Sequence, residues 1–282
     1  MPSPAIPVSV IIPTHNRAGF LAQAIDSVLG QTYTNFELIV VDDGSSDETQ
    51  PLLASYGKAL VTLYQENRGP AAARNAGIRA ARHPLLAFLD SDDQFTRHKL
   101  ALQAAAMEAQ PDLLISHTQE TWFRNGRHLN QKKHHTKAGG DIFARNLALC
   151  VVGMSTVMAR QELFERIGLF DESFPCCEDY EFWLRASVAH PFLLVDAPLT
   201  AKHGGRPDQV SVRFQTGMDR LRIRALEKLL SSSPLTSAQS RLVCEELVRK
   251  AVLYGNGCLK HGRLEEGQGC LSLAARYSPL PL

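Results

Sequence analysis

The sequence predicts an α/β fold with a mostly parallel sheet flanked by helices and a helical extension at its C-terminal end. Short runs rich in Val, Ile and Leu alternate with helix-length segments over the first hundred residues. A polar cluster follows each of these runs, and from residue 217 onward only amphipathic helical patterns occur. Strands that alternate with helices at this spacing are typical of parallel sheets.

Four short apolar runs are the predicted strands: "VSVII" (8–12), "FELIVV" (36–41), "LVTLY" (60–64) and "LLAFL" (85–89). Helices are expected at about 18–30, 47–56, 70–82 and 97–109. Ser, Asp or Gly-Pro residues at their starts supply the capping chemistry of helix N-termini. Each strand and the helix after it therefore form one unit of a βαβ arrangement.

Composition excludes several classes of partner. The 282 residues include 30 basic and 29 acidic side chains, for a formal net charge of +1, so no overall field attracts nucleic acid or anionic lipid. The longest apolar runs fall short of the roughly 18 residues of a transmembrane helix, and the first residues do not read as a signal peptide. We therefore expect a cytoplasmic protein with reduced cysteines, for which peripheral association with a membrane stays open.

Polar residues gather where the predicted strands end. "PTHNR" (13–17), "DDGSSDE" (42–48), "QENRG" (65–69) and "DSDD" (90–93) each follow one strand. One such cluster alone would read as a solvated loop. Because parallel strands end at a shared edge, where α/β sheets bind ligands, the four together predict a binding site.

The last of these clusters predicts a metal-assisted diphosphate site. Asp90, Asp92 and Asp93 are close enough to repel one another, which destabilises the fold unless a cation or a shared proton compensates. Mg²⁺ or Mn²⁺ prefers oxygen ligands and usually takes one or two protein carboxylates together with phosphate oxygens. A D-x-D triplet arises often by chance, so its position after a buried strand carries the prediction.

A second pair of carboxylates opens a predicted helix in "CCEDYEFWLRASVA" (176–189). Tyr180, Trp183 and Leu184 fall on one stripe, which indicates a helix that packs inward. Glu178 and Asp179 lie in its first turn, where acidic residues also stabilise a helix through its dipole. From these residues alone, a structural and a catalytic role are both open.

Five segments together resemble the family 2 glycosyltransferases over about residues 6–215. They are "VSVIIPTHNR", "ELIVVDDGSSDET", "NRGPAAARNAGI", "LLAFLDSDD" and "GLFDESFPCCEDYEFWLRAS". The resemblance implies a GT-A fold, which is a Rossmann-like mixed, mostly parallel sheet flanked by helices. It also implies a nucleotide-sugar donor, Mn²⁺ or Mg²⁺ as cofactor, and inversion at the anomeric carbon. Within a glycosyltransferase domain at 1–215, it places the nucleotide in 6–110 and the acceptor and catalytic base in 111–215.

The resemblance also assigns roles to single residues. Asp179 would be the general base with Glu178 in support, Asp43 would bind the base edge of the nucleotide, and Asp42 would support its loop. Asp92 and Asp93 are the implied metal ligands, with His203 as a further candidate, and which carboxylate of the "DSDD" cluster ligates stays open. Nucleotide contacts are implied for Pro13, Thr14, His15, Asn16, Asp43, Arg74, Asp90 and Ser91. For Arg74, the alternative is a solvated arginine at a helix start.

Two further segments have structural interpretations. "HLNQKKHHTKAGG" contains the adjacent His134 and His135, but its Lys-rich, Gly-ended composition favours a solvated loop over a metal site. The extension at 216–282 is predicted to pack its amphipathic helices on the preceding domain, with self-association or partner binding as alternatives.

The sequence thus predicts an inverting glycosyltransferase that moves a sugar, most simply from a UDP-sugar, to a glycan or lipid-linked acceptor. GDP- and dTDP-sugars are the alternative donors. A nucleotidyltransferase would usually carry a Gly-rich, Lys-bearing loop after the first strand, where this chain has "PTHNRAGF". A non-catalytic nucleotide-sugar sensor or scaffold is the other alternative, against which the intact "DSDD" and "ED" segments argue. The sequence does not specify the donor sugar, the acceptor or the linkage.

Overall fold

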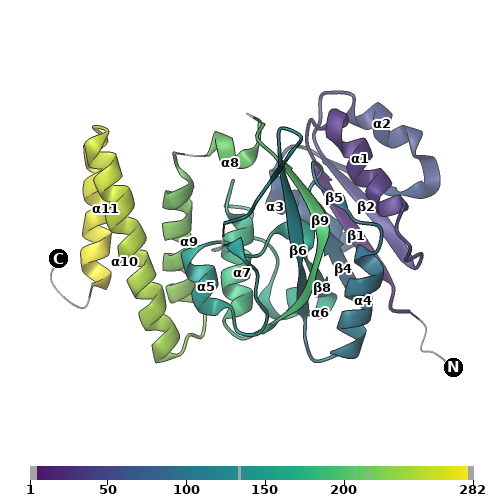
Figure 1. Cartoon of the computed structure of the whole chain (residues 1–282). Helices are drawn as coiled ribbons and strands as arrows, with labels where there is room; N and C mark the ends of the chain where they lie inside the picture. The colour runs from purple at the N-terminus through teal and green to yellow at the C-terminus, as the bar shows by residue number, and fades with distance from the viewer. Residues whose placement is uncertain (1–4, 133–134, 207, 215, 279–282) are drawn as a thin grey trace.

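The structure is a computed structural model that describes residues 5–132, 135–206, 208–214 and 216–278. Within these residues, one mixed sheet has the strand order β3-β2-β1-β4-β8-β6-β9-β5, with β7 paired to β6 (Figure 1). The strands are β1 (Val8–Thr14), β2 (Phe36–Asp43), β3 (Val61–Gln65), β4 (Leu85–Phe88), β5 (Gln94–Phe95), β6 (Ile115–Arg124), β7 (Arg127–Leu129), β8 (Met158–Arg160) and β9 (Phe192–Gly204).

The four predicted strands form the parallel half of this sheet. β3, β2, β1 and β4 pair in parallel, and their bounds match the four apolar runs. Successive residues of β1 alternate between two cores: Val10 and Ile12 pack into one cluster and Ile11 into another. Both faces of this half are therefore covered by helices, as the continuous apolar runs predict.

The predicted helices of the first half are present as α1 (Ala18–Leu29), α2 (Thr49–Ser55), α3 (Pro70–Ala80) and α4 (Lys99–Ala109). Residues of α1 and α4 join the core on one face of the sheet, and residues of α3 join the core on the other. α3 begins with Pro70 after Gly69, whose φ of 88° suits glycine. The second half adds α5 (Phe143–Ala148), α6 (Gln161–Ile167), α7 (Glu178–Ser187) and α8 (Val210–Arg213).

The other half of the sheet depends on the long pairing of β6 with β9. These strands run parallel from Ile115 opposite Phe192 to Arg124 opposite Gly204, with register shifts on both sides of Gln119. Beyond the shifts, Glu120 lies opposite Thr200 and Trp122 opposite Lys202. Residues two apart on a strand share a face, so Glu120 and Trp122 project to the same side of the sheet.

The C-terminal helices are α9 (Met218–Ser232), α10 (Ser237–Lys260) and α11 (Leu264–Tyr277). α9 and α10 pack on the α/β domain, as predicted, and α11 packs on α10 (Figure 1). Leu226 of α9 and Leu247 of α10 share one buried cluster with Leu147 of α5 and with Tyr180 and Leu184 of α7. The extension therefore supports the helix that carries the second carboxylate pair. The division into domains at residue 215 stays a prediction.

Two other expectations bear on the environment of the protein. None of the six cysteines forms a disulfide, and all six lie among the described residues. No helix in the described part of the chain combines the length and apolarity that crossing a bilayer requires.

The contact of α3 with the sheet predicts opposite effects for two glycine substitutions. A Cβ at Gly77 would lie 2.4 Å from Ile11 Cγ2, whereas one at Gly19 in α1 would meet no atom within 4 Å. We expect Gly77→Ala to lower the free energy of unfolding by about 1–3 kcal/mol through overpacking. Gly19→Ala should raise it by about 0.5–1 kcal/mol because alanine favours a helix. Denaturant unfolding measures both, and equal shifts would contradict this packing.

Candidate active site

A cleft of about 1160 Å³ runs along the carboxyl ends of the parallel strands. All four predicted polar clusters contribute to its wall, together with the first turn of α7 and residues of β6 and β9. Among the predicted site residues, its lining includes Pro13, Thr14, His15, Asp43, Arg74, Asp90, Ser91, Asp92, Asp93, Glu178, Asp179 and His203. Asn16 is exposed outside this lining, and its side-chain oxygen accepts a hydrogen bond from Ser46 N at 2.7 Å.

At the end of the cleft beside β1–β3, Asp43 organises the loop before α3. Its side chain is buried and accepts hydrogen bonds from Arg68 N at 2.9 Å, Gly69 N at 2.8 Å and the Gln65 amide at 2.7 Å. Both carboxylate oxygens thus have protein donors. The predicted contact with a nucleotide base stays a prediction, and such a base would share these oxygens with the loop.

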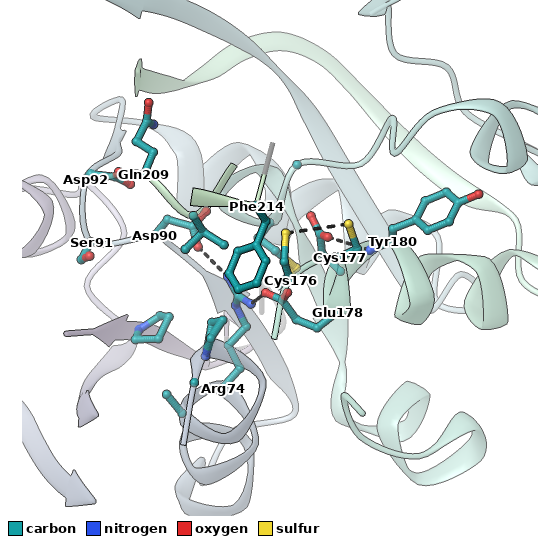
Figure 2. Close-up of a pocket in the computed structure, with 18 of the residues that line it drawn as sticks. Arg74, Asp90, Ser91, Asp92, Cys176, Cys177, Glu178, Tyr180, Gln209 and Phe214 are labelled. Atoms are coloured by element: carbon teal, nitrogen blue, oxygen red, sulfur yellow. Dashed lines mark hydrogen bonds and ion pairs between the residues drawn. The ribbon is translucent and has the colours of Figure 1, made fainter. Parts of the chain in front are cut away.

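Arg74 of α3 joins the two carboxylate clusters. Its Nη2 lies 2.8 Å from Asp90 Oδ1, and its Nη1 lies 2.5 Å from Glu178 Oε1 (Figure 2). The side chain is only 6% exposed, which excludes the solvated-arginine alternative. Burial alone would lower the pKa of Arg74, but the Asp90 and Glu178 carboxylates raise it, so the guanidinium stays charged. The resulting bridge spans three segments that are far apart in the sequence.

The carboxylates of the "DSDD" loop have different surroundings. Asp93 is buried, and its oxygens accept hydrogen bonds from Ser155 Oγ at 2.7 Å and His203 N at 3.0 Å. Burial, aided by the neighbouring Asp92 and Asp90, raises the pKa of Asp93 to about 8. Asp92 forms an ion pair with Arg206, yet burial and Asp90 still raise its pKa. Asp93 therefore links the "DSDD" loop to strand β9 through a hydrogen bond.

These contacts bear on which residues would hold a metal. No group of three or more His, Cys, Asp or Glu side chains in the described residues is arranged to bind an ion without further ligands. Asp90 and Asp92 are partly exposed on the cleft, with 31% and 19% of their side chains accessible. Two carboxylates completed by phosphate oxygens fit Mg²⁺ or Mn²⁺. Asp90 and Asp92 each have one oxygen paired with an arginine, whereas Asp93 is buried and both of its oxygens accept protein hydrogen bonds, so the geometry favours the first two.

His203 lines the cleft, and its role as a further metal ligand stays a prediction. Its backbone N–H, rather than its ring, contacts Asp93. The ring stacks on Phe123 with centroids 5.1 Å apart and planes 14° apart, and burial lowers its pKa. An aromatic contact thus accounts for the position of this imidazole.

Glu178 and Asp179, at the start of α7, differ in how deeply they are buried. The helix starts after Cys177, whose φ of 62° turns the chain sharply. Glu178 is buried against Arg74, and burial raises its pKa, with Asp179 adding to the effect and Arg74 opposing it. Asp179 is half-buried in the cleft wall, where Tyr180 N donates to Oδ1 at 2.7 Å and Cys150 Sγ contacts Oδ2 at 3.7 Å.

The structure adds cleft residues that sequence reasoning missed. Glu120 and Trp122 of β6 and Lys202 of β9 line it, as do residues 150–154 and parts of the segment from Gln209 to Arg222. Figure 2 shows Phe214 of that last segment in front of Arg74. The only signal for these residues in the sequence was the spacing of Glu120 and Trp122 in "TQETWF", which places both on one face of a strand. This spacing does not indicate that the face lines a cleft.

Most described residues of the segment with the paired histidines are exposed, as expected of a solvated loop, but part of the segment packs against the cleft wall. His135 is half-buried, and its ring centroid lies 4.8 Å from that of Trp122. His134 lies outside the described residues.

With the fold and site defined, comparisons place the chain among known proteins. The family model "Glycosyl transferase family 2" matches residues 9–168, which is more than half of the chain. The Staphylococcus aureus TarS 1–349 structure in complex with UDP superposes with a TM-score of 0.70 at 22% identity, covering 97% of this chain and 81% of that one. The fold is therefore GT-A. The chain belongs to glycosyl transferase family 2.

Curated relatives match over the same region. An uncharacterized glycosyltransferase of Rickettsia felis is 37% identical over 195 residues, or 68% of this chain and 32% of the relative. The Escherichia coli protein WfgD is 31% identical over 182 residues, 63% of this chain and 68% of its own length. WfgD is named a UDP-Glc:α-D-GlcNAc-diphosphoundecaprenol β-1,3-glucosyltransferase. The match thus covers about a third of the Rickettsia felis protein.

The Arg74 bridge predicts a large stability effect. Arg74→Gln leaves Glu178 buried without its cation, so we expect the free energy of unfolding to fall by about 3–5 kcal/mol. The exposed pair of Arg166 with Glu162 is the matched control, and Arg166→Gln should cost about 1 kcal/mol or less. Adding Glu178→Gln to Arg74→Gln should restore part of the loss. If denaturant unfolding gives Arg74→Gln and Arg166→Gln the same free energy of unfolding, the prediction that the Arg74 bridge stabilises the fold more than an exposed ion pair is wrong.

Proposed function

We propose that this protein is an inverting glycosyltransferase that transfers a sugar from a UDP-sugar to a lipid-linked or glycan acceptor. The observation that carries the proposal is the Arg74 bridge, which holds the "DSDD" loop and the first turn of α7 at one cleft. A group that binds the diphosphate and a group that accepts a proton are thereby available to the same substrate. WfgD supports UDP as the nucleotide, since its name specifies UDP-glucose.

The nucleotide would occupy the end of the cleft beside β1–β3. His15 and Asn67 meet there, with the Asn67 amide 3.0 Å from the His15 ring, and both line the cleft. Asp90 and Asp92 would hold Mn²⁺ or Mg²⁺. When bound, the ion would neutralise charge on the departing diphosphate. A GDP-mannose complex with Mn²⁺ exists for the Pyrobaculum calidifontis mannosyltransferase, which shares the fold at a TM-score of 0.64 and 17% identity.

Asp179 would accept the proton of the attacking hydroxyl. The acceptor oxygen forms a bond to the anomeric carbon as the bond from that carbon to the diphosphate oxygen breaks, and the hydroxyl proton passes to the carboxylate. Tyr180 N holds one oxygen of Asp179 in place. Glu178 is committed to Arg74, so the two adjacent carboxylates have separate tasks. Displacement from the side opposite the diphosphate inverts the anomeric carbon.

The mouth of the cleft suits an amphiphilic acceptor. Val210, Phe214 and Met218 line it together with the cations Arg213 and Arg222. Apolar and cationic side chains side by side match a lipid carried on a phosphate or diphosphate. The lipid-diphosphate acceptor named for WfgD supports the same class. This acceptor would place the protein at the cytoplasmic face of a membrane.

The test is binding and turnover of nucleotide sugars with and without metal. UDP and UDP-glucose should bind at least about tenfold more tightly with Mn²⁺ than in chelator, and more tightly than GDP-mannose. Asp92→Asn should abolish the dependence on metal. Asp196→Asn, an exposed aspartate of β9 that is absent from the cleft lining, is the matched control and should retain it.

Calorimetry measures the affinities, and UDP release without acceptor measures donor hydrolysis. Metal-independent UDP binding would contradict the proposed site. Tight binding with no hydrolysis and no transfer to any acceptor would instead identify a sensor.

A further inference from the structure

One corner of the cleft has no task in the donor chemistry. It is formed by Glu120 and Trp122 of β6, Lys202 of β9 and the segment that carries His135 and Lys137. In the sheet, β8 and β4 separate β6 from β1 and the nucleotide loops. The "DSDD" loop follows β4 and therefore lies between the nucleotide end and this corner.

Trp122 is fixed in this corner by contacts with both neighbours. Its indole Nε1 donates to Glu120 Oε1 at 2.7 Å. The His135 ring lies 4.8 Å from the indole at an interplanar angle of 56°. A half-buried indole with a satisfied N–H presents its remaining apolar surface to the cleft. Such a surface matches the C–H face of a pyranose ring.

Glu120 has an unsatisfied acceptor beside that indole. Its side chain is 6% exposed, and Oε2 makes no hydrogen bond within the described residues. Lys137 Nζ lies 3.4 Å from Oε2, in an ion pair rather than a hydrogen bond. Burial opposes ionisation of Glu120, but Lys137 and Lys202 lower its pKa and keep it charged at neutral pH. The Glu120 carboxylate forms part of the cleft wall beside the indole, where a charged acceptor suits a donating ligand hydroxyl.

The corner adjoins the proposed base through residues 150–154. A Cβ at Gly153 would lie 2.9 Å from Glu120 Oε2, so this position packs directly on the carboxylate. Three residues earlier, Cys150 contacts Asp179 Oδ2 at 3.7 Å. Lys202 is within electrostatic range of both Glu120 and Asp179. Residues 150–154 therefore connect the wall around Trp122 to the group that takes the acceptor proton, and both line the same cleft.

We propose that Trp122, Glu120 and Lys202 form the subsite for the acceptor sugar, a pyranose that stacks on the indole and donates a hydroxyl to the Glu120 carboxylate. The inference rests on the proposed function. The donor sugar is tethered to a diphosphate at Asp90 and Asp92, whereas the acceptor hydroxyl must reach Asp179.

Tryptophan emission gives a direct test, because the chain contains two tryptophans and Trp183 is fully buried. With UDP and Mn²⁺ present, methyl glycosides of glucose, galactose, mannose, N-acetylglucosamine and glucuronic acid are titrated up to their solubility limits. At least one of these glycosides should change the wild-type emission saturably. Trp122→Phe, which retains Trp183, should abolish the change.

Substitutions separate sugar recognition from structure. Glu120→Gln should weaken the glycoside about tenfold, as loss of a hydrogen bond to a charged group predicts, and leave UDP affinity within about twofold. Leu129→Ala, at the exposed position of β7 opposite Trp122, is the control and should leave both unchanged.

Three results would overturn the subsite: no emission change with any glycoside, an unchanged glycoside affinity in Glu120→Gln, or equal loss of UDP and glycoside binding in that variant. Failure of wild-type UDP binding would be a failure of the proposed function and is seen separately in the same titration.

Discussion

The organisation of the site depends on one buried guanidinium with a carboxylate on each side. Arg74 lies between Asp90 and Glu178, which belong to the loop after β4 and the first turn of α7. Withdrawing the charges of Arg74 and Glu178 from water is costly, and their mutual neutralisation at hydrogen-bonding distance, with Asp90 on the other side of the guanidinium, compensates for it. The planar, always charged guanidinium can face two carboxylates at once, which an ammonium group does less well.

Burial also divides the acidic residues of the cleft by task. Asp43 and Asp93 use their oxygens to hold the loop before α3 and strand β9, and Glu178 holds Arg74. Asp90, Asp92 and Asp179 keep exposure to the cleft and are the residues to which the proposed mechanism assigns contact with substrate or metal. Closely spaced carboxylates thus serve partly as structural acceptors, which the spacing of the residues does not reveal.

The sequence predicted the parallel half of the fold well because its signals are local. Each apolar run and each Ser, Asp or Gly-Pro helix start is readable within about ten residues, and the shared strand edge follows from topology. Arg74 was harder to predict, because its partners lie 16 and 104 positions away. Asn16 belonged to a cluster that reaches the cleft, yet its side chain turns to Ser46 instead.

The corner of the cleft around Trp122 could not be predicted from the sequence either, because its contacts are also long-range. Glu120 and Trp122 acquire their setting from the β6–β9 pairing, whose register shifts beside Gln119 have no counterpart in the alternation of residues. The contact of Cys150 with Asp179 likewise joins two segments 29 residues apart. Local patterns specified strands and helices, whereas the long-range pairs that give these side chains their chemistry required the structure.

The central claim is that Asp179 acts as the base in a site assembled by Arg74, and replacement by its amide tests it most directly. Asp179→Asn keeps the size of the side chain and removes its capacity to accept the proton. UDP-sugar affinity should stay within a few-fold, and turnover should fall on the order of 10²- to 10⁴-fold. A folded Asp179→Asn protein that transfers sugar at near wild-type turnover would contradict the account and leave this carboxylate as a stabiliser of the α7 N-terminus.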